Sequence, residues 1–455
     1  MAYDNRDSID FGKEEIHKLF RSIFVPTLLG MLFNMAFILT DGIFVGHGIG
    51  PNGLASINLV APVMMCLTGI GMMFGIGSSV VAAIHLSHEN LKAARINLTQ
   101  GMIGAVMLSV VIVALLYLFP NGALRLLGTS EELLDSTREY LVWFVPTCLL
   151  LMIQIVGGFG IRLDGSPKYA MYCSIIPACI NIFFDYLFIF PCHMGLKGAA
   201  LATDIGTAVG ALMVGYYFIG PVKTLKYYKL KASGTSMRLF ARNAGYMVKV
   251  GFSGFIGEFA LSMMMLCGNR AFGKYLGDTG VAAYSVVCYL YPIVYNVFYA
   301  VSTSAQPIIS FNHGAQKDER VSGTFRFSVG ISLAFAAGVT VLMWLFSAPI
   351  VSVFLERGTA TFPYASEGLP FFALGFVMNG FNVSAIGYFQ SVTNNRNSTL
   401  LMSMRGVIMP IVTFWIFPML WGTLGLWLAM PASELITTCC AVAFLKKTPL
   451  APQDR

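Results

Sequence analysis

Twelve long apolar stretches divide this chain, and they constrain its fold more than any other feature of the sequence. A helix needs about 20 residues to cross the roughly 30 Å of hydrocarbon in a bilayer, and each stretch is long enough. Only helices and closed β-barrels can span a bilayer, and these stretches are too long and too uniformly apolar to be barrel strands. We therefore predict an all-α membrane protein with twelve transmembrane helices. These cover residues 22–46, 54–84, 97–120, 139–161, 169–191, 196–219, 246–273, 281–311, 324–347, 366–389, 399–420 and 424–445.

The scarcity of charge supports the same conclusion. Only 11% of the 455 residues are charged and 56% are hydrophobic, whereas a soluble protein carries about 25% charged residues. This composition excludes a soluble enzyme, a nucleic-acid-binding domain and a disordered protein. The nine cysteines lie mostly in apolar stretches without a C-x-x-C pair, so neither a disulfide framework nor a metal site is expected.

The basic residues predict the orientation in the membrane. With the N-terminus inside, about four-fifths of the 29 Lys and Arg fall on the inner side, Arg405 among them. Cytoplasmic loops carry such an excess, so we expect a plasma-membrane protein with both termini in the cytoplasm. The net charge of +7 is then a signal of topology and requires no nucleic acid.

The second half of the chain repeats the first at an offset of about 227 residues. GLKGAALAT (195–203) matches GTLGLWLAM (422–430), residues 78–95 match 303–320, and 161–171 match 389–402. Six helices per repeat give both halves the same orientation, so we predict two parallel, pseudo-symmetric six-helix lobes, an architecture of transporters. The predicted parts are a cytoplasmic N-terminal segment (1–21), an N-terminal lobe (22–219), a basic linker (220–245), a C-terminal lobe (246–445) and a cytoplasmic tail (446–455).

Five acidic residues fall within the predicted helices: Asp41, Asp185, Asp204, Glu258 and Glu434. Acids in hydrocarbon are energetically expensive and are functional by default. For Asp204 and Glu434 the sequence leaves open whether they are functional or only cap a helix or lie at the water boundary. Glu258 lies mid-span with no cation within a helical turn, which favours a functional role.

The first-half acids have polar neighbours. Asn181 precedes Asp185 by four residues, so both point along one helix face, and Thr203 adds a hydroxyl. With Asp41 they form a predicted oxygen cluster that can hold Na⁺ or a proton.

Several motifs are distributed along the chain: TDGIFVGHGIGPNGLA, IRLDGSPKYAM, NIFFDYLFIF, GLKGAALAT, AQPIISFNHGA, the stretch 389–405 and the position of Glu258. In these motifs the sequence resembles the multidrug and toxic compound extrusion (MATE) family of antiporters along essentially its whole length. The resemblance implies a coupling-cation site at Asp41, Asn181, Asp185 and Thr203, and a first helix that bends at the candidate hinge Pro26. Some Na⁺-driven members have a second acidic pair in the C-terminal lobe. Here Glu258 matches one member and Asn379 replaces the other, which leaves Glu258 and Asn379 as a candidate secondary cation or substrate site.

We therefore predict a non-enzymatic multidrug exporter that exchanges H⁺ or Na⁺ for cationic amphipathic organic compounds by alternating access. It is expected to act as a monomer, with no cofactor apart from the coupling ion. A lipid-linked oligosaccharide flippase of the same wider superfamily is one alternative, but its pyrophosphate cargo would need basic residues in the spans, where Arg270 is the nearest. A membrane-embedded enzyme is the other, but no paired nucleophile and base is found there. The sequence does not separate H⁺ from Na⁺.

Overall fold

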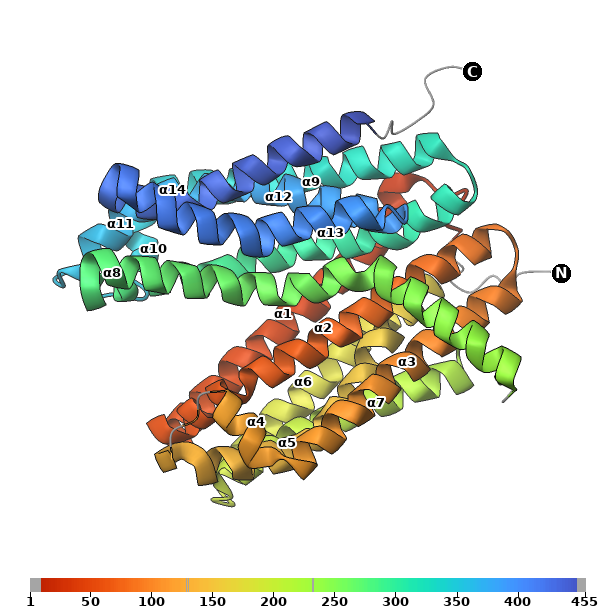
Figure 1. Ribbon diagram of the computed structural model, residues 1–455, viewed down its shortest axis with the longest axis horizontal. Helices are drawn as coiled ribbons and strands as arrows, with labels where there is room; N and C mark the ends of the chain where they lie inside the picture. The colour runs from red at the N-terminus through yellow and green to blue at the C-terminus, as the bar shows by residue number, and fades with distance from the viewer. Residues whose placement is uncertain (1–9, 128, 130, 231–232, 448–455) are drawn as a thin grey trace. The chain divides into compact units, whose positions relative to one another are not determined.

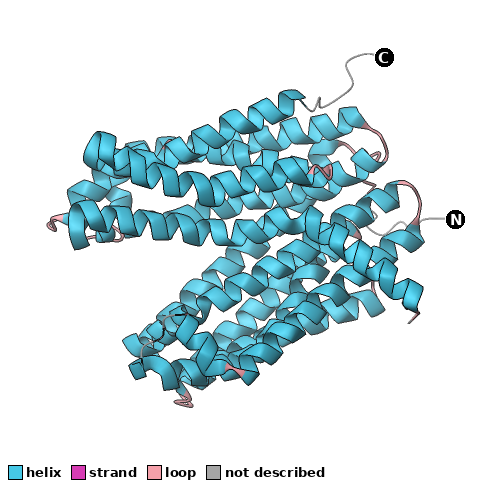
Figure 2. Ribbon diagram, viewed as in Figure 1, coloured by secondary structure: helices cyan, strands magenta, loops and turns pink. Residues whose placement is uncertain are grey.

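The computed structural model describes residues 10–127, 129, 131–230 and 233–447. These residues form helices joined by short connections, with no strand among them (Figures 1 and 2). The predicted all-α fold is confirmed. The ends of the predicted terminal segments, 1–9 and 448–455, and residues 231–232 of the predicted linker lie outside the described residues.

The helices of the first half are α1 (Ile16–Gly48), α2 (Pro51–Ser87), α3 (Leu91–Leu118), α4 (Pro120–Leu126), α5 (Glu131–Leu163), α6 (Pro167–Ile189) and α7 (Gly195–Ile219). They are followed by α8 (Gly234–Gly314), α9 (Asp318–Leu345), α10 (Ser347–Val351), α11 (Thr361–Ala373), α12 (Gly375–Ser391), α13 (Asn395–Ser403), a π-helical turn η1 (Met404–Ile408) and α14 (Met409–Lys447).

The described residues contain nine helical segments that are long and apolar enough to cross a membrane. The pair α11 and α12, bent by 41°, makes a tenth. Two of the nine contain a break at a glycine with positive φ, Gly277 in α8 and Gly422 in α14, a conformation that glycine adopts without steric cost. The chain turns back at each break (Figure 1). Across the first of them, the ring of Phe272 stacks on that of Tyr284. Each broken helix therefore supplies two spans, which gives the twelve predicted from the sequence.

The internal repeat is present in the backbone. Residues with positive φ recur in pairs at one constant separation, as Gly50 with Gly277, Glu89 with Gln316, and Gly195 with Gly422. Helices α3 and α9 have the same length of 28 residues, and each is followed by a short helix. The two halves thus share a succession of helices and turns.

By its contacts the chain divides into two compact units, one containing Arg21–Phe255 and the other containing Glu15–Phe20 and the chain from Ile256 onward. The first turns of α1 belong to the second unit, where the rings of His17 and Phe20 contact Phe327 edge-on. The beginning of α8, up to Phe255, belongs to the first unit, whereas the sequence suggested a second lobe from residue 246. The predicted domain bounds remain predictions.

Each unit has its own apolar core, and both also expose many large apolar side chains. Examples are Leu212, Ile219 and Leu345, which are 71%, 84% and 72% exposed. Such surface is unfavourable in water and is what helices that face lipid require.

Glycines let the beginning of α8 pack directly on α2 in the first unit. A Cβ on Gly251 would lie 1.8 Å from the carbonyl oxygen of Met73, and one on Gly77 would lie 2.1 Å from that of Met247. Because both obstacles are backbone atoms, a methyl group can be accommodated only by moving a helix. We expect Gly251→Ala to lower the free energy of unfolding by about 1–3 kcal/mol, measured as the melting temperature Tm in detergent. Gly245→Ala, on the same helix with nothing within 4 Å, is the control; equal Tm values for the two variants would contradict this prediction.

Asp164 ties the segment after α7 to the end of α5. Its carboxylate is 6% exposed. Oδ2 accepts hydrogen bonds from the Tyr217 hydroxyl at 2.7 Å and the Lys223 N–H at 2.8 Å. Oδ1 accepts from the N–H groups of Thr224 and Leu225 at 2.8 and 2.7 Å. One side chain therefore satisfies three successive backbone donors that no helix pairs.

Replacing Asp164 by Asn is expected to weaken this anchor. An amide has only one acceptor oxygen, and its NH2 group would face two of the donors whose hydrogen bonds the second carboxylate oxygen now accepts. We expect a loss of about 2–4 kcal/mol from the unpaired donors and the lost charge-assisted bonds, visible as a lower Tm. Asp278→Asn changes an exposed carboxylate and should leave Tm unchanged. A Tm for Asp164→Asn equal to that of this control would rule out an anchoring role.

Candidate functional site

Three helices of the first unit carry the residues predicted to hold the coupling cation. Asp41 lies on α1, Asn181 and Asp185 lie one turn apart on α6, and Thr203 lies on α7. Helices α6 and α7 approach closely at Gly206, where a Cβ would lie 2.9 Å from the Asn181 Cβ. A larger residue at this glycine would push Asn181 and Thr203 apart.

The four predicted residues meet in space. Asn181 Nδ2 donates to Thr203 Oγ1 at 3.3 Å, and Thr203 Oγ1 donates in turn to the Ala199 carbonyl at 3.1 Å. The carboxyl groups of Asp41 and Asp185 lie within hydrogen-bonding reach of each other. Two carboxylates are both acceptors, so this bond forms only when one of them carries a proton.

Four buried oxygens of this cluster have no hydrogen-bond partner among the described residues. They are Oδ1 of Asp41, Oδ1 of Asn181, and both carboxylate oxygens of Asp185, whose side chain is 0% exposed. A buried carboxylate without a donor or counter-ion is unfavourable by several kcal/mol. A proton or a small hard cation would remove that cost, and carboxylate and amide oxygens are the ligands that hard cations prefer.

Asp204, the next residue on α7, has a partner within the chain. Its Oδ1 accepts a hydrogen bond from the Thr147 hydroxyl on α5. It is therefore held by a neighbouring helix in the first unit, and it differs from Asp185, whose oxygens have no donor.

In the second unit Glu434 is paired with Arg405, which answers the question left open for Glu434 and corrects the placement of Arg405. Glu434 is 0% exposed and lies 2.9 Å from Arg405 Nε, so it is neither a helix cap nor a residue at the water boundary. Arg405, counted above with the inner basic residues, is 3% exposed inside the helix bundle. Arg270, expected to be the basic residue nearest to the spans, is exposed. The position of Arg405 inside the apolar stretch 399–420 is the signal that identifies it as a buried cation.

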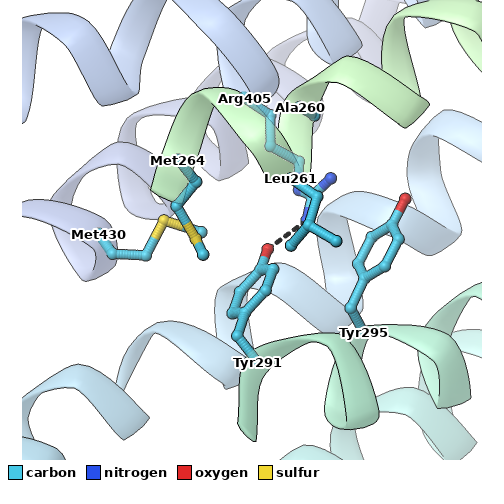
Figure 3. A pocket seen from close by; sticks show the side chains of 7 residues that line it. All are labelled: Ala260, Leu261, Met264, Tyr291, Tyr295, Arg405 and Met430. Carbon is cyan, nitrogen blue, oxygen red and sulfur yellow. Dashed lines mark hydrogen bonds between the residues drawn. The ribbon is translucent and has the colours of Figure 1, made fainter. Parts of the chain in front are cut away.

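Amide and hydroxyl groups complete the surroundings of this pair. Asn379 Nδ2 donates to Glu434 Oε1 at 2.9 Å, and Asn382 Nδ2 donates to Oε2 at 2.7 Å. The Tyr291 hydroxyl accepts from Arg405 Nη2 at 2.7 Å and from Asn379 Nδ2 at 2.6 Å. Arg405 and Tyr291 also line a small pocket (Figure 3), together with Ala260, Leu261, Met264, Tyr295 and Met430.

The structure does not join Glu258 and Asn379, the two residues of the candidate secondary site. Asn379 is engaged with Glu434 and Tyr291. Glu258 is half-buried on α8, and no hydrogen bond or ion pair links it to any described residue.

Helix α1 runs through Pro26 as one helix from Ile16 to Gly48, and Pro26 is buried. The predicted bend at this residue therefore stays a prediction. Among the described residues, no three His, Cys, Asp or Glu side chains are grouped so that they could hold a metal ion.

A model of the MatE family matches residues 26–187 and again residues 255–416, one match in each half of the internal repeat. The multidrug export protein MepA of Staphylococcus saprophyticus is 23% identical over 434 residues, which covers 95% of this chain and 93% of that protein. The FAD transporter of Shewanella oneidensis is 24% identical over 368 residues, covering 79% and 78%. A crystal structure of MATE in complex with MaD3S has a TM-score of 0.87 at 19% identity over 96% of both chains, which establishes a common fold.

Proposed function

Because this chain belongs to the MatE family, we propose that it is a multi-pass membrane exporter that exchanges H⁺ or Na⁺ for cationic amphipathic organic compounds. The observation that carries this proposal is the group of four unpartnered buried oxygens at Asp41, Asn181 and Asp185. Their uncompensated charge gives an inorganic cation or proton a reason to bind within the first unit. The protein is further proposed to act as a monomer in the cell membrane, with both termini in the cytoplasm.

Coupling follows from electrostatics at this cluster. With the cluster unoccupied, its carboxylates attract a positively charged compound. A bound proton or Na⁺ cancels that charge and favours release of the compound. An ion can drive such a cycle only through its different affinity for the two conformations. In this scheme α1, which carries Asp41, transmits the change in occupancy by bending at Pro26.

The charges of the buried side chains support a cationic cargo. In the described membrane helices, Arg405 is the buried cation, and Glu434 neutralises it. The carboxylates of Asp41 and Asp185 have no such partner. The potential near the cluster is therefore negative, which attracts cations and repels anions.

The two named relatives differ in their cargo, one being a multidrug export protein and the other an FAD transporter. FAD and a lipid-linked oligosaccharide both carry a pyrophosphate, which an unpaired buried Arg or Lys would bind best. Since Arg405 is already bound to Glu434, this chain offers less support for an anionic cargo. An enzymatic function has no support from a nucleophile and base in the site described.

Purified protein in liposomes tests the proposal. A cationic dye is loaded, and its movement is followed under a Na⁺ gradient at clamped pH and, separately, under a pH gradient without Na⁺. We expect the gradient of one of the two ions to drive the dye against the dye's own concentration gradient. Dye movement that depends on neither ion gradient would overturn the proposal, as would transport of FAD or a lipid-linked oligosaccharide instead of the dye.

A further inference from the structure

The two halves of the repeat differ in whether a buried carboxylate has hydrogen-bond donors within the chain. In the first unit both oxygens of Asp185 lack a hydrogen-bond donor. In the second unit Glu434 Oε1 accepts from Arg405 and Asn379, and Oε2 accepts from Asn382. One carboxylate is thus left for an ion from outside the chain, and the other is neutralised by the chain itself.

The two clusters stand on equivalent helices. Within the repeat, α6 corresponds to the helix that begins at α13, and α7, which begins at Gly195, corresponds to the part of α14 that follows Gly422. In the first half, Asp185 lies on α6 and Thr203 lies on α7. In the second half, Arg405 lies on the helix that corresponds to α6, and Glu434 lies on the part of α14 that corresponds to α7. At the separation of 227 residues, Arg405 corresponds to Ala178 and Glu434 to Thr207, so the ion pair lies on the helices equivalent to those of the oxygen cluster, one to two turns along them from the positions of Asp185 and Thr203.

The contacts of Arg405 are those that a bound cation would make. Its Nε lies 2.9 Å from a Glu434 oxygen, its Nη2 lies 2.7 Å from the Tyr291 hydroxyl, and its guanidinium carbon lies 5.0 Å from the centre of the Tyr295 ring. A carboxylate, a hydroxyl and an aromatic face all stabilise positive charge.

The backbone at Arg405 is specialised. Met404–Ile408 forms a π-helical turn. Such turns are rare in proteins, and those that occur are often found at functional sites. A Cβ on Gly406 would lie 2.5 Å from the Cβ of Ala260, so this turn packs directly on α8. That contact brings Arg405 to Tyr291 and Tyr295, which lie on the returning arm of the same helix.

We propose that Arg405 is a fixed internal cation that takes the place of a coupling ion beside Glu434 and thereby confines ion coupling to the first unit. This inference rests on the proposed function, in which binding of an ion at the first-unit cluster is coupled to export. The charged or titratable groups that face Arg405 are Glu434 on α14 and Tyr291 and Tyr295 on α8, with Glu258 also acting electrostatically on Tyr295. The buried Oδ1 of Asn379 has no donor and would be a further ligand once the guanidinium is removed.

The test measures how Tm in detergent depends on ions. Purified variants are titrated with NaCl at constant ionic strength, using choline chloride as the substitute, and separately with pH. In Asp41→Asn/Asp185→Asn protein, which lacks the first-unit site, we expect no dependence on Na⁺. Adding Arg405→Gln should restore a dependence of roughly 2 °C for each tenfold rise in Na⁺ or each unit fall in pH. A folded triple variant with a flat response would overturn the proposal.

Two further variants separate charge from packing. Adding Glu434→Gln to the triple variant removes the unpaired carboxylate and should abolish the regained response. Arg405→Lys in the double-Asn background retains the positive charge and should respond to Na⁺ and pH no more than the double-Asn protein itself; a larger response there would also overturn the proposal, even if the Gln variant fails to fold. Failure of the proposed function is a different result, since it would appear as absent ion-driven dye transport by the wild-type protein.

Discussion

Asp185→Asn is expected to abolish ion-driven export without lowering the stability of the protein. The substitution removes one of two carboxyl groups that lie within reach of each other, together with the charge on which binding of the ion depends. It relieves the burial of a carboxylate whose two oxygens have no donor, so Tm should stay equal or rise. Loss of function and loss of stability are thereby separated in a single variant.

The measurement is the gradient of a cationic dye that vesicles sustain. A tenfold ion gradient, exchanged one for one, can support about a tenfold dye gradient, since each factor of ten is about 1.4 kcal/mol. Wild-type protein should approach this value, and Asp185→Asn should sustain none. Asp135→Asn, at an exposed position of the same unit, is the control. Full dye accumulation by Asp185→Asn would remove this carboxylate from the coupling mechanism.

Glu434→Gln is expected to have the opposite profile, a large loss of stability. Three donors converge on this carboxylate, from Arg405, Asn379 and Asn382, and an amide has one oxygen to accept them. Arginine keeps its proton at any pH that proteins tolerate, so its charge would remain buried and unpaired. Breaking one side of a buried ion pair costs about 3–5 kcal/mol.

Thermal unfolding in detergent measures this loss, with Glu367→Gln, an exposed change on α11, as the control. We expect Glu434→Gln to be more destabilising than Arg405→Gln, because a carboxylate left alone can take up a proton and a guanidinium cannot release one. Equal Tm values for Glu434→Gln and its control would show that the pair contributes nothing to the fold.

The helices and the shared helix face of Asn181 and Asp185 could be predicted from the sequence because each rests on local information. Apolar length predicts a span, and the i,i+4 spacing of Asn181 and Asp185 places both on one helix face. The repeated sequence pairs Gly195 with Gly422, and the backbone has positive φ at both. These properties depend on neighbours along the chain, so the chain order is sufficient to find them.

Arg405 shows the limit of such reasoning. Counting basic residues by position assigns it to the inner surface, whereas it lies buried against Glu434. The family resemblance compares Asn379 with a partner of Glu258, yet Asn379 bonds to Glu434 and Tyr291. Charge pairing between helices far apart in the chain depends on which faces meet, and hydropathy alone contains no information about that.

The sequence by itself determined that this chain is a repeated bundle of membrane helices, because every backbone polar group in lipid must be satisfied within a helix. It also identified the acids whose presence in such helices demands an explanation. Tertiary structure decided which of those acids are neutralised. Asp185 is left without a donor while Glu434 is fully paired, because the energy of a buried charge depends on the groups that packing brings within about 3 Å of it.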